Sequence, residues 1–181
     1  FGAQGLAVML DTDGKLDSSF DSDGLQLLSV TSQQVRFNSV AIDHNNKIVL
    51  GGDVFNPADD NIDLYLARLN LDGSLDTSFN SSGINITNLG QAEGINNLTV
   101  LADNTIIAVG RQLSISNEIS QALVAKFLSN GALDSSGFNS GQGYQILDVD
   151  SSVGDNSDIL YDVAVATDGT IYASGASNST T

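Results

Sequence analysis

Three segments of the chain repeat one another at a constant spacing of 59 residues. The clearest copy is Leu75–Phe79, with the sequence Leu-Asp-Thr-Ser-Phe, and its counterparts are Leu16–Phe20 and Leu133–Phe138. Each copy follows an apolar segment and an Asp-Gly or Asn-Gly pair. Self-similarity at a fixed period indicates a repeat architecture, in which each copy forms one structural unit and stacks on its neighbours. The 181 residues therefore predict three such units.

Two further apolar segments in each repeat predict a β-hairpin. The turns between them are centred on Asn45-Asn46, Asp103-Asn104 and Asp168-Gly169. These residue types accept the positive φ that a type I′ turn requires. Each returning segment is expected to end at a glycine where two backbones crowd together, namely at Gly52, Gly110 and Gly175. Because the hairpin segments are almost continuously apolar, we expect them to be the buried inner strands.

The segment after each phenylalanine predicts a fourth strand, because its apolar and polar residues tend to alternate. These segments are Leu25–Leu28, Ile84–Thr87 and Tyr144–Leu147. Four strands in a radially repeated unit are typical of a β-propeller blade. The sequence thus predicts an all-β fold with three blade equivalents of four antiparallel strands. Closed propellers have about four to eight blades, so the ring is expected to be incomplete in this chain.

The whole chain, residues 1–181, is predicted to be a single propeller segment. The repeat boundaries fall near 16–74, 75–132 and 133–181, and residues 1–15 form the end of a preceding repeat. The favoured explanation of this offset is a cut through a longer array of blades. The alternative is that two chains pair their open ends into a six-bladed ring, which would cover otherwise exposed edge strands.

Charge and composition exclude several classes of partner. The chain has 22 acidic and six basic residues, for a net charge of −16. Nucleic acid and anionic membrane surfaces would be repelled, so we expect neither as a partner, and no segment is apolar enough for membrane insertion. Twenty of the acids are Asp, the acid that turns favour, which agrees with an all-β chain. Cysteine is absent, so thiols say nothing about the compartment.

The sharpest local motif is an Asp-x-Asp-Gly loop. Asp11, Asp13 and Asp17 have the spacing of loops that wrap a hard cation such as Ca²⁺. The counterparts in the later repeats include Leu128, which carries no side-chain oxygen. The favoured interpretation is that the carboxylates cap their own turns. No metal site or other cofactor is therefore assigned, and calcium at Asp11, Asp13 and Asp17 is the alternative.

No catalytic residue is predicted. His44 is the only histidine, it lies beside a hairpin turn, and its counterparts are Ala102 and Thr167, so an exposed turn residue is the favoured interpretation. The recurring phenylalanines at the end of each motif are expected to be packing anchors rather than a ligand platform. No pair of carboxylates stands out from the turn aspartates as a general acid and nucleophile.

The pattern resembles the delta-60 repeat, a bacterial β-propeller repeat of unknown function found in secreted and cell-surface proteins. Residues Asp72–Phe79, Asp-Gly-Ser-Leu-Asp-Thr-Ser-Phe, match its signature, and Asp168–Ile171 is similar to its second half. The third repeat departs from the pattern through Gly137 and the longer loop Asp148–Asp158. The resemblance implies an extracellular or cell-surface location in bacteria, with a signal peptide outside residues 1–181. It assigns no catalytic residues.

We therefore expect a secreted or cell-surface module that acts in binding, adhesion or scaffolding, with a protein or glycan as ligand. One alternative is a structural subunit that completes a ring or array with further blades of the same protein or with other copies of the chain. The other is an enzyme with an acidic propeller channel that acts on glycans, which is disfavoured. We expect no enzymatic activity.

Overall fold

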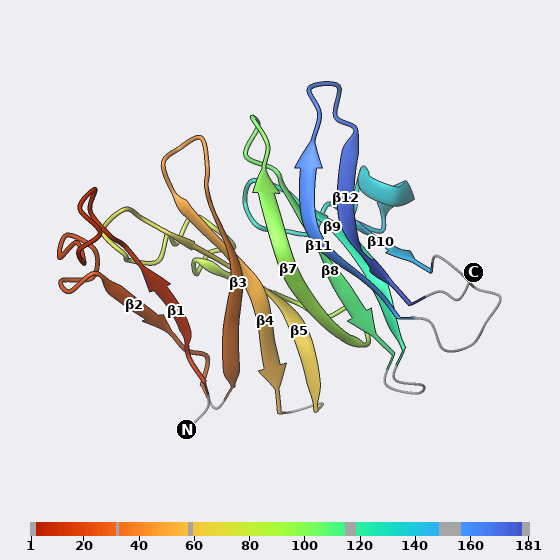
Figure 1. The fold of residues 1–181 in the computed structure, drawn as a ribbon, viewed down its shortest axis with the longest axis horizontal. Helices are drawn as coiled ribbons and strands as arrows, with labels where there is room; N and C mark the ends of the chain where they lie inside the picture. Colours follow the sequence, from red (N-terminus) through yellow and green to blue (C-terminus); the bar gives the residue numbers. More distant parts are fainter. Residues whose placement is uncertain (1–2, 32, 58–59, 115–118, 149–156, 179–181) are drawn as a thin grey trace.

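Four antiparallel sheets stand side by side in the order of the chain (Figure 1). The structure is a computed structural model that describes residues 3–31, 33–57, 60–114, 119–148 and 157–178. Within these residues, no helix is long and apolar enough to cross a membrane.

Two of the sheets are complete four-stranded blades. The first blade contains β3 (Gln34–Ile42), β4 (Ile48–Asn56), β5 (Asn61–Leu69) and β6 (Ile84–Thr87), paired in that order. The second contains β7 (Ala92–Val100), β8 (Ile106–Leu113), β9 (Ser120–Phe127) and β10 (Tyr144–Leu147), and a short 3₁₀ segment, η1 (Phe138–Gly141), precedes its last strand. The flanking sheets have two strands each: β1 (Gly5–Val8) with β2 (Leu25–Leu28), and β11 (Asp158–Val165) with β12 (Ile171–Ser177).

Each flanking sheet corresponds to half a blade. The β1–β2 pair has Val8 opposite Leu25, as Ala67 lies opposite Ile84 between β5 and β6, so it represents strands three and four. The β11–β12 pair repeats the hairpin of β3 and β4, so it represents strands one and two. The prediction of an all-β fold with three propeller-type blade equivalents is confirmed. The sheets do not close into a ring.

The two middle strands of a blade are the most buried, not the two hairpin strands as predicted. Strands β4 and β5 are buried over nearly their whole length, whereas β3 alternates between exposed and partly buried residues. The middle strands have hydrogen-bonded neighbours on both sides and a sheet in front of them. The innermost strand has one free edge, and β3 also faces only the two strands of β1 and β2. The apolar residues of β3 therefore remain partly exposed, which the sequence did not predict.

The core lies between sheets rather than within one. Three apolar clusters fill the three junctions. The cluster between the first and second blades is the largest and contains Val49, Leu64, Leu66, Phe79, Ile95, Leu98, Ile106, Ala108, Leu123, Ala125 and Phe127. The second cluster joins β1 and β2 to the first blade, and the third joins the second blade to β11 and β12. A blade alone would leave these side chains in water, so each sheet depends on its neighbour for stability.

A contact that we call the phenylalanine lock fixes two of the three described junctions at their outer side. The Phe79 ring is fully buried and lies against Gly131 of the next blade, where a Cβ would come within 2.6 Å of the ring. Asn80 and Ser81 then adopt positive φ, and the Asn80 N–H donates to the Asn130 carbonyl at 2.8 Å. The same lock recurs one junction earlier with Phe20, Gly73, Asp21 and Asp72. The prediction that Phe20 and Phe79 are packing anchors is confirmed.

The recurring glycine of the hairpin lies in the middle of its strand, so the prediction that the strand ends there is wrong. Gly110 faces a β-bulge at Asn96, and a Cβ on it would lie 1.9 Å from the Gly94 carbonyl oxygen. The ladder continues to Leu113 because the bulge absorbs the irregularity. The equivalent distances at Gly52 and Gly175 are 1.8 and 1.9 Å.

We expect Gly110→Ala to lower the free energy of unfolding by about 3 kcal/mol, because the new methyl group collides with backbone that cannot move aside. Gly94→Ala in the facing strand is the matched control, since its Cβ would lie 3.6 Å from the nearest atom, an ordinary contact. Urea denaturation of both variants checks this. Equal stability of the two variants would contradict the assignment of Gly110 to steric crowding.

Candidate functional site

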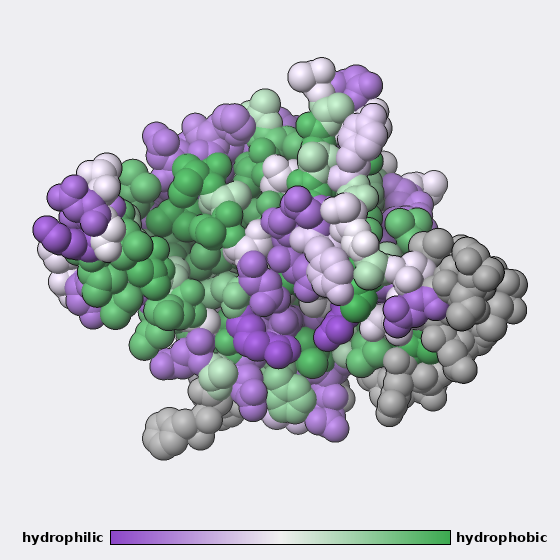
Figure 2. Space-filling model, in the orientation of Figure 1, coloured by the Kyte–Doolittle hydropathy of each residue, from purple (hydrophilic) through white to green (hydrophobic). Residues whose placement is uncertain are grey.

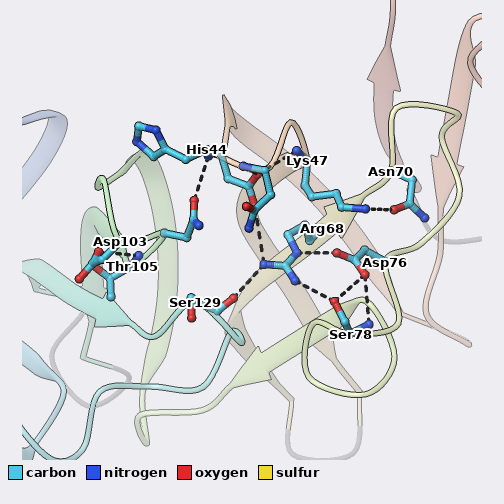
Figure 3. A network of polar contacts seen from close by, with 12 residues as sticks. His44, Lys47, Arg68, Asn70, Asp76, Ser78, Asp103, Thr105 and Ser129 are labelled. Carbon is cyan, nitrogen blue, oxygen red and sulfur yellow. Dashed lines mark hydrogen bonds and ion pairs between the residues drawn. The ribbon is translucent and has the colours of Figure 1, made fainter.

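A network of polar contacts centred on Arg68 holds the turn ends of the two complete blades together (Figure 3). Arg68 is 8% exposed, and its Nε donates to Asp76 Oδ2 at 2.9 Å. Its Nη1 reaches across the junction to the Ser129 carbonyl at 2.8 Å, and its Nη2 donates to the Ser78 hydroxyl at 3.1 Å. The guanidinium carbon also lies 4.8 Å from the centre of the Phe79 ring. The network thus reinforces the phenylalanine lock, and all three guanidinium nitrogens of Arg68 donate to groups of the protein itself.

The hairpin tips meet in the same region. The backbone N–H of His44 donates to Asn104 Oδ1 of the next blade at 2.8 Å. His44 itself is exposed. Asp43 accepts from its own turn and lies 3.7 Å from Arg68 Nη1. The position of His44 is thus that of an exposed turn residue, as expected. Its main chain, rather than its imidazole, makes the contact between blades.

The aspartate motif near the start of the chain lies in a turn at this end. Asp11 Oδ1 accepts from the N–H groups of Asp13 and Lys15, both at 2.9 Å, and Asp17 Oδ1 accepts from Ser19 N–H at 2.9 Å. Among the described residues, no group of three or more His, Cys, Asp or Glu side chains lies close enough to hold a metal ion. The loop Asp148–Asp158 is described only at its ends, so most of it lies outside the described residues.

Asp76 is the counterpart of Asp17 in the first complete blade. Burial acts to raise its pKa, but hydrogen bonds from the Ser78 hydroxyl and N–H and the charge of Arg68 outweigh that effect, so the pKa falls below its ordinary 3.8. A carboxyl group whose pKa is lower in the folded than in the unfolded state stabilises the fold above the unfolded pKa. That contribution is lost as the pH falls through the folded pKa.

Asp76→Asn is expected to lower the free energy of unfolding at pH 7 by about 2 kcal/mol, the usual scale for hydrogen bonds to a charged group. The difference from the parent protein should shrink as the pH falls from the ordinary pKa of 3.8 through the lower folded pKa, because Asp76 is protonated first in the unfolded state and then in the folded state. Chemical denaturation at a series of pH values measures it. Asp13→Asn, which removes one exposed charge from a chain of net charge −16, is the control. A difference that does not vary with pH would contradict the role of the charge.

We expect the melting temperature to be the same with millimolar Ca²⁺ and with a chelator, because Asp11 is already engaged by its own turn. Differential scanning calorimetry with Ca²⁺ or Mg²⁺ at equal ionic strength checks this. A stabilisation by Ca²⁺ alone that disappears in Asp11→Asn would establish the calcium alternative instead, since a ligand bound only by the folded state raises its stability.

The opposite end of the junction between the complete blades contains a polar cavity of about 220 Å³. It lies where β3 and β7 begin and where β4 and β8 end. In Figure 2, hydrophilic side chains gather over the lower middle of the face that is shown. The cavity is lined by Arg36, Asn38, Asp53, Ile62, Ala92, Glu93, Gly94, Asn96, Arg111 and Leu113.

One wall of the cavity is an ion pair with an amide beside it. Arg36 contacts Asp53 Oδ1 through Nε at 2.9 Å and through Nη2 at 2.8 Å; its side chain is 62% exposed, whereas that of Asp53 is 10% exposed. Asn38, the bulge residue of β3, donates across the junction to the Ile95 carbonyl at 2.8 Å. Its Nδ2 also lies 3.5 Å from Asp53 Oδ2. This wall therefore presents the Arg36 guanidinium, which Asp53 partly neutralises, and the Asn38 amide, whose oxygen accepts no hydrogen bond from a described residue.

The opposite wall carries a second amide and a second guanidinium. Asn96, the bulge residue of β7, repeats the Asn38 contact by donating to the Leu160 carbonyl at 2.7 Å. Arg111 on β8 is exposed, and its guanidinium has no ion-pair or hydrogen-bond partner in the part of the chain that the structure describes. An unpaired guanidinium beside two amide oxygens can bind a carboxylate and hydroxyl groups together.

A buried carboxyl group lies behind this wall. Glu93 is 1% exposed and accepts from Gln112 Nε2 at 3.0 Å and from the N–H groups of Gln91 and Leu89 at 2.8 and 3.2 Å. Burial raises its pKa and the charge of Asp63 adds to this effect, although the three donors oppose it. A raised folded pKa favours folding most at acidic pH, and this contribution falls as the pH rises. Because Leu89 and Gln91 lie between β6 and β7, their hydrogen bonds to Glu93 hold the β6–β7 connection in place.

A row of polar contacts continues from the cavity along the innermost strands. Ser39 on β3 donates to Asn97 Oδ1 on β7 at 2.8 Å, and Asn97 donates to Asp162 Oδ1 on β11 at 2.7 Å. These residues occupy equivalent positions in three successive sheets. The side of the molecule that faces the propeller axis is therefore polar next to the cavity.

The sequence analysis missed the residues of this cavity because the motifs on which it relied, the hairpin turns and the segments that end in Phe20, Phe79 and Phe138, lie outside the cavity. The available signal was a charge that changes from one repeat to the next. Arg36 corresponds to the uncharged Gly94 and Ile159, whereas Glu93 corresponds to Val35 in one repeat and to the acid Asp158 in another. Arg111 in the second blade occupies the position that Asp53 has in the first, so a basic residue replaces an acidic one. Asp11, Asp13 and Asp17, the residues of the calcium alternative, do not line the cavity.

Two stretches of the chain match a known family. Residues 45–79 and 101–136 match the family described as a domain of unknown function (DUF5122) beta-propeller. Each stretch runs from the hairpin turn through the middle strands, and the first ends at the phenylalanine lock. The chain is thus similar to a β-propeller repeat family, in agreement with its four-stranded sheets. No curated protein sequence matches the chain.

Proposed function

We propose that this propeller segment is a binding module, and that the cavity between its complete blades takes a small carboxylate-bearing group. The observation that carries the proposal is the position of its positive charges. The chain has only six basic residues against 22 acids, yet Arg36 and Arg111 both line this one cavity. A guanidinium without a partner in a strongly acidic protein favours an anionic ligand locally, while the surrounding acids repel extended polyanions.

The ligand class that fits best is a glycan with an acidic sugar. The amide oxygens of Asn38 and Asn96 accept sugar hydroxyl groups, and Arg111 pairs with the carboxylate in a planar, two-point contact. A volume of about 220 Å³ limits the bound portion to a single sugar unit or a group of similar size. A protein ligand would have to place an Asp or Glu side chain in the same position.

Binding is proposed in preference to catalysis. Glu93 is the cavity residue with a raised pKa, a property of general acids. Its two oxygens are engaged by three donors of the protein itself, which supports a positioning role. We further propose, from the resemblance to the delta-60 repeat, that the module acts at the bacterial cell surface or after secretion, in adhesion or scaffolding.

Isothermal titration calorimetry with a glucuronate-containing oligosaccharide tests the proposal. Arg111→Ala is expected to weaken binding about ten-fold, which corresponds to about 1.4 kcal/mol. Lys15→Ala is the matched control, because it removes one positive charge from an exposed turn outside the cavity. Equal binding of the corresponding neutral oligosaccharide, or equal loss in the two variants, would contradict the proposed site.

A further inference from the structure

We propose that Asp53 determines which anions the cavity between the complete blades accepts: it makes the cavity prefer a sugar with one negative charge, such as a uronic acid, to a sugar phosphate with two. This inference rests on the proposed function, because it concerns the selectivity of the same site. All residues that line the cavity belong to β3, β4 and β5 of the first blade or to β7 and β8 of the second. The walls of the cavity are therefore formed without the two-stranded sheets at either end.

The cavity is lined by two bases and two acids, which differ in how far they are engaged by the protein. The bases are Arg36 and Arg111, and the acids are Asp53 and Glu93. Glu93 is 1% exposed and accepts hydrogen bonds from the Gln112 amide and from two backbone N–H groups. These donors stabilise its carboxylate where it is. The charge that a ligand meets is therefore set mainly by Asp53 and the two arginines.

The register of the hairpins explains why one of the two arginines is paired and the other is not. In the first blade Arg36 lies directly opposite Asp53 on the neighbouring strand, a position at which opposite charges attract. In the second blade the residue opposite Arg111 is Gly94, which has no side chain. Arg36 is thus neutralised by Asp53, whereas Arg111 makes no hydrogen bond or ion pair within the described residues.

The Asp53 carboxylate is placed to act on a ligand as well as on Arg36. Its Oδ1 takes both contacts from Arg36, at 2.9 Å from Nε and 2.8 Å from Nη2. Its Oδ2 has one long contact, 3.5 Å from Asn38 Nδ2, and lies 3.6 Å from the position that a Cβ of Gly94 would take. Because Gly94 has no side chain, this oxygen faces the cavity. It can accept a hydroxyl group of a bound sugar, and it repels a further negative charge.

This arrangement discriminates between ligands by their charge. A single carboxylate matches the one free guanidinium, that of Arg111, in a two-point contact. A phosphate ester carries about −1.5 to −2 charges near neutral pH, so it brings a second charge into the cavity. That charge meets Asp53 rather than a second free base, because Arg36 is already occupied. An unfavourable like-charge contact of this kind lowers the affinity for the wrong ligand and so provides specificity.

Isothermal titration calorimetry of Asp53→Asn with glucuronate and with glucose 6-phosphate tests the proposal, because these sugars differ in the acidic group at one end. The parent protein should bind glucuronate more tightly. In Asp53→Asn the affinity for glucose 6-phosphate relative to glucuronate should rise about ten-fold at about pH 8, where the phosphate is dianionic. The substitution removes the repelling charge and leaves Arg36 with a weaker, neutral acceptor.

Two further variants identify the cause of the change. Asp13→Asn removes the same charge from an exposed turn outside the cavity, so it should leave the ratio of the two affinities unchanged. Arg36→Ala combined with Asp53→Asn leaves Arg111 as the one base of the cavity and should restore the preference for glucuronate. The Asp53→Asn protein should remain folded by circular dichroism, because the Arg36 side chain is 62% exposed and water can solvate its charge.

An unchanged ratio in Asp53→Asn, an equal change in Asp13→Asn, or a gain of the same size in the double variant would overturn the role of Asp53. Failure of the proposed function gives a different result. If the parent protein binds glucuronate and the ratio is unchanged, the cavity is a binding site whose selectivity has another cause. If the parent protein binds no glucuronate but Asp53→Asn binds glucose 6-phosphate, the role of Asp53 is supported and the acidic sugar is not the ligand. Binding of neither sugar by either protein would overturn both.

Discussion

Apolar packing between neighbouring sheets is the interaction on which the rest of this structure depends. A four-stranded sheet here has two apolar faces and no second layer of its own, so it buries them only against the next sheet. The repeated motifs all act at that junction. The phenylalanine lock holds its outer side, and the glycine opposite the bulge makes room for the backbone of the inner strand. The asparagine of the bulge then donates across the junction.

The two ends of the junction between the complete blades differ in whether their arginine side chains are bound by the protein itself. At the turn end Arg68 uses its donors on Asp76, Ser78 and Ser129, and the junction there is closed. At the other end a cavity lies between the sheets, and Arg111 has no hydrogen-bond or ion-pair partner among the described residues. A guanidinium in the first environment stabilises the fold, whereas in the second it is available to a ligand. Position within the junction, rather than residue type, separates the two roles.

The exposed apolar side chains at both ends of the chain follow from the same packing rule. Leu6, Val8 and Tyr172 have the residue types of buried blade positions, but each is about half exposed or more because no described sheet covers its face. In a chain that carries little charge apart from its aspartates, such a surface is unusual for a solvated face.

The sequence by itself determined the all-β class, the four-stranded repeat, the hairpin turns and the packing role of Phe20 and Phe79, because these depend on local periodicity and on a motif that recurs every 59 residues. It misjudged which strands are most buried and placed the glycines at strand ends, since exposure and bulges depend on the neighbouring sheet. Only the tertiary structure showed that Arg36, Asn96 and Arg111, from three strands, line one cavity. The two arginines break the repeat, and contacts between positions far apart in the chain have no local signature.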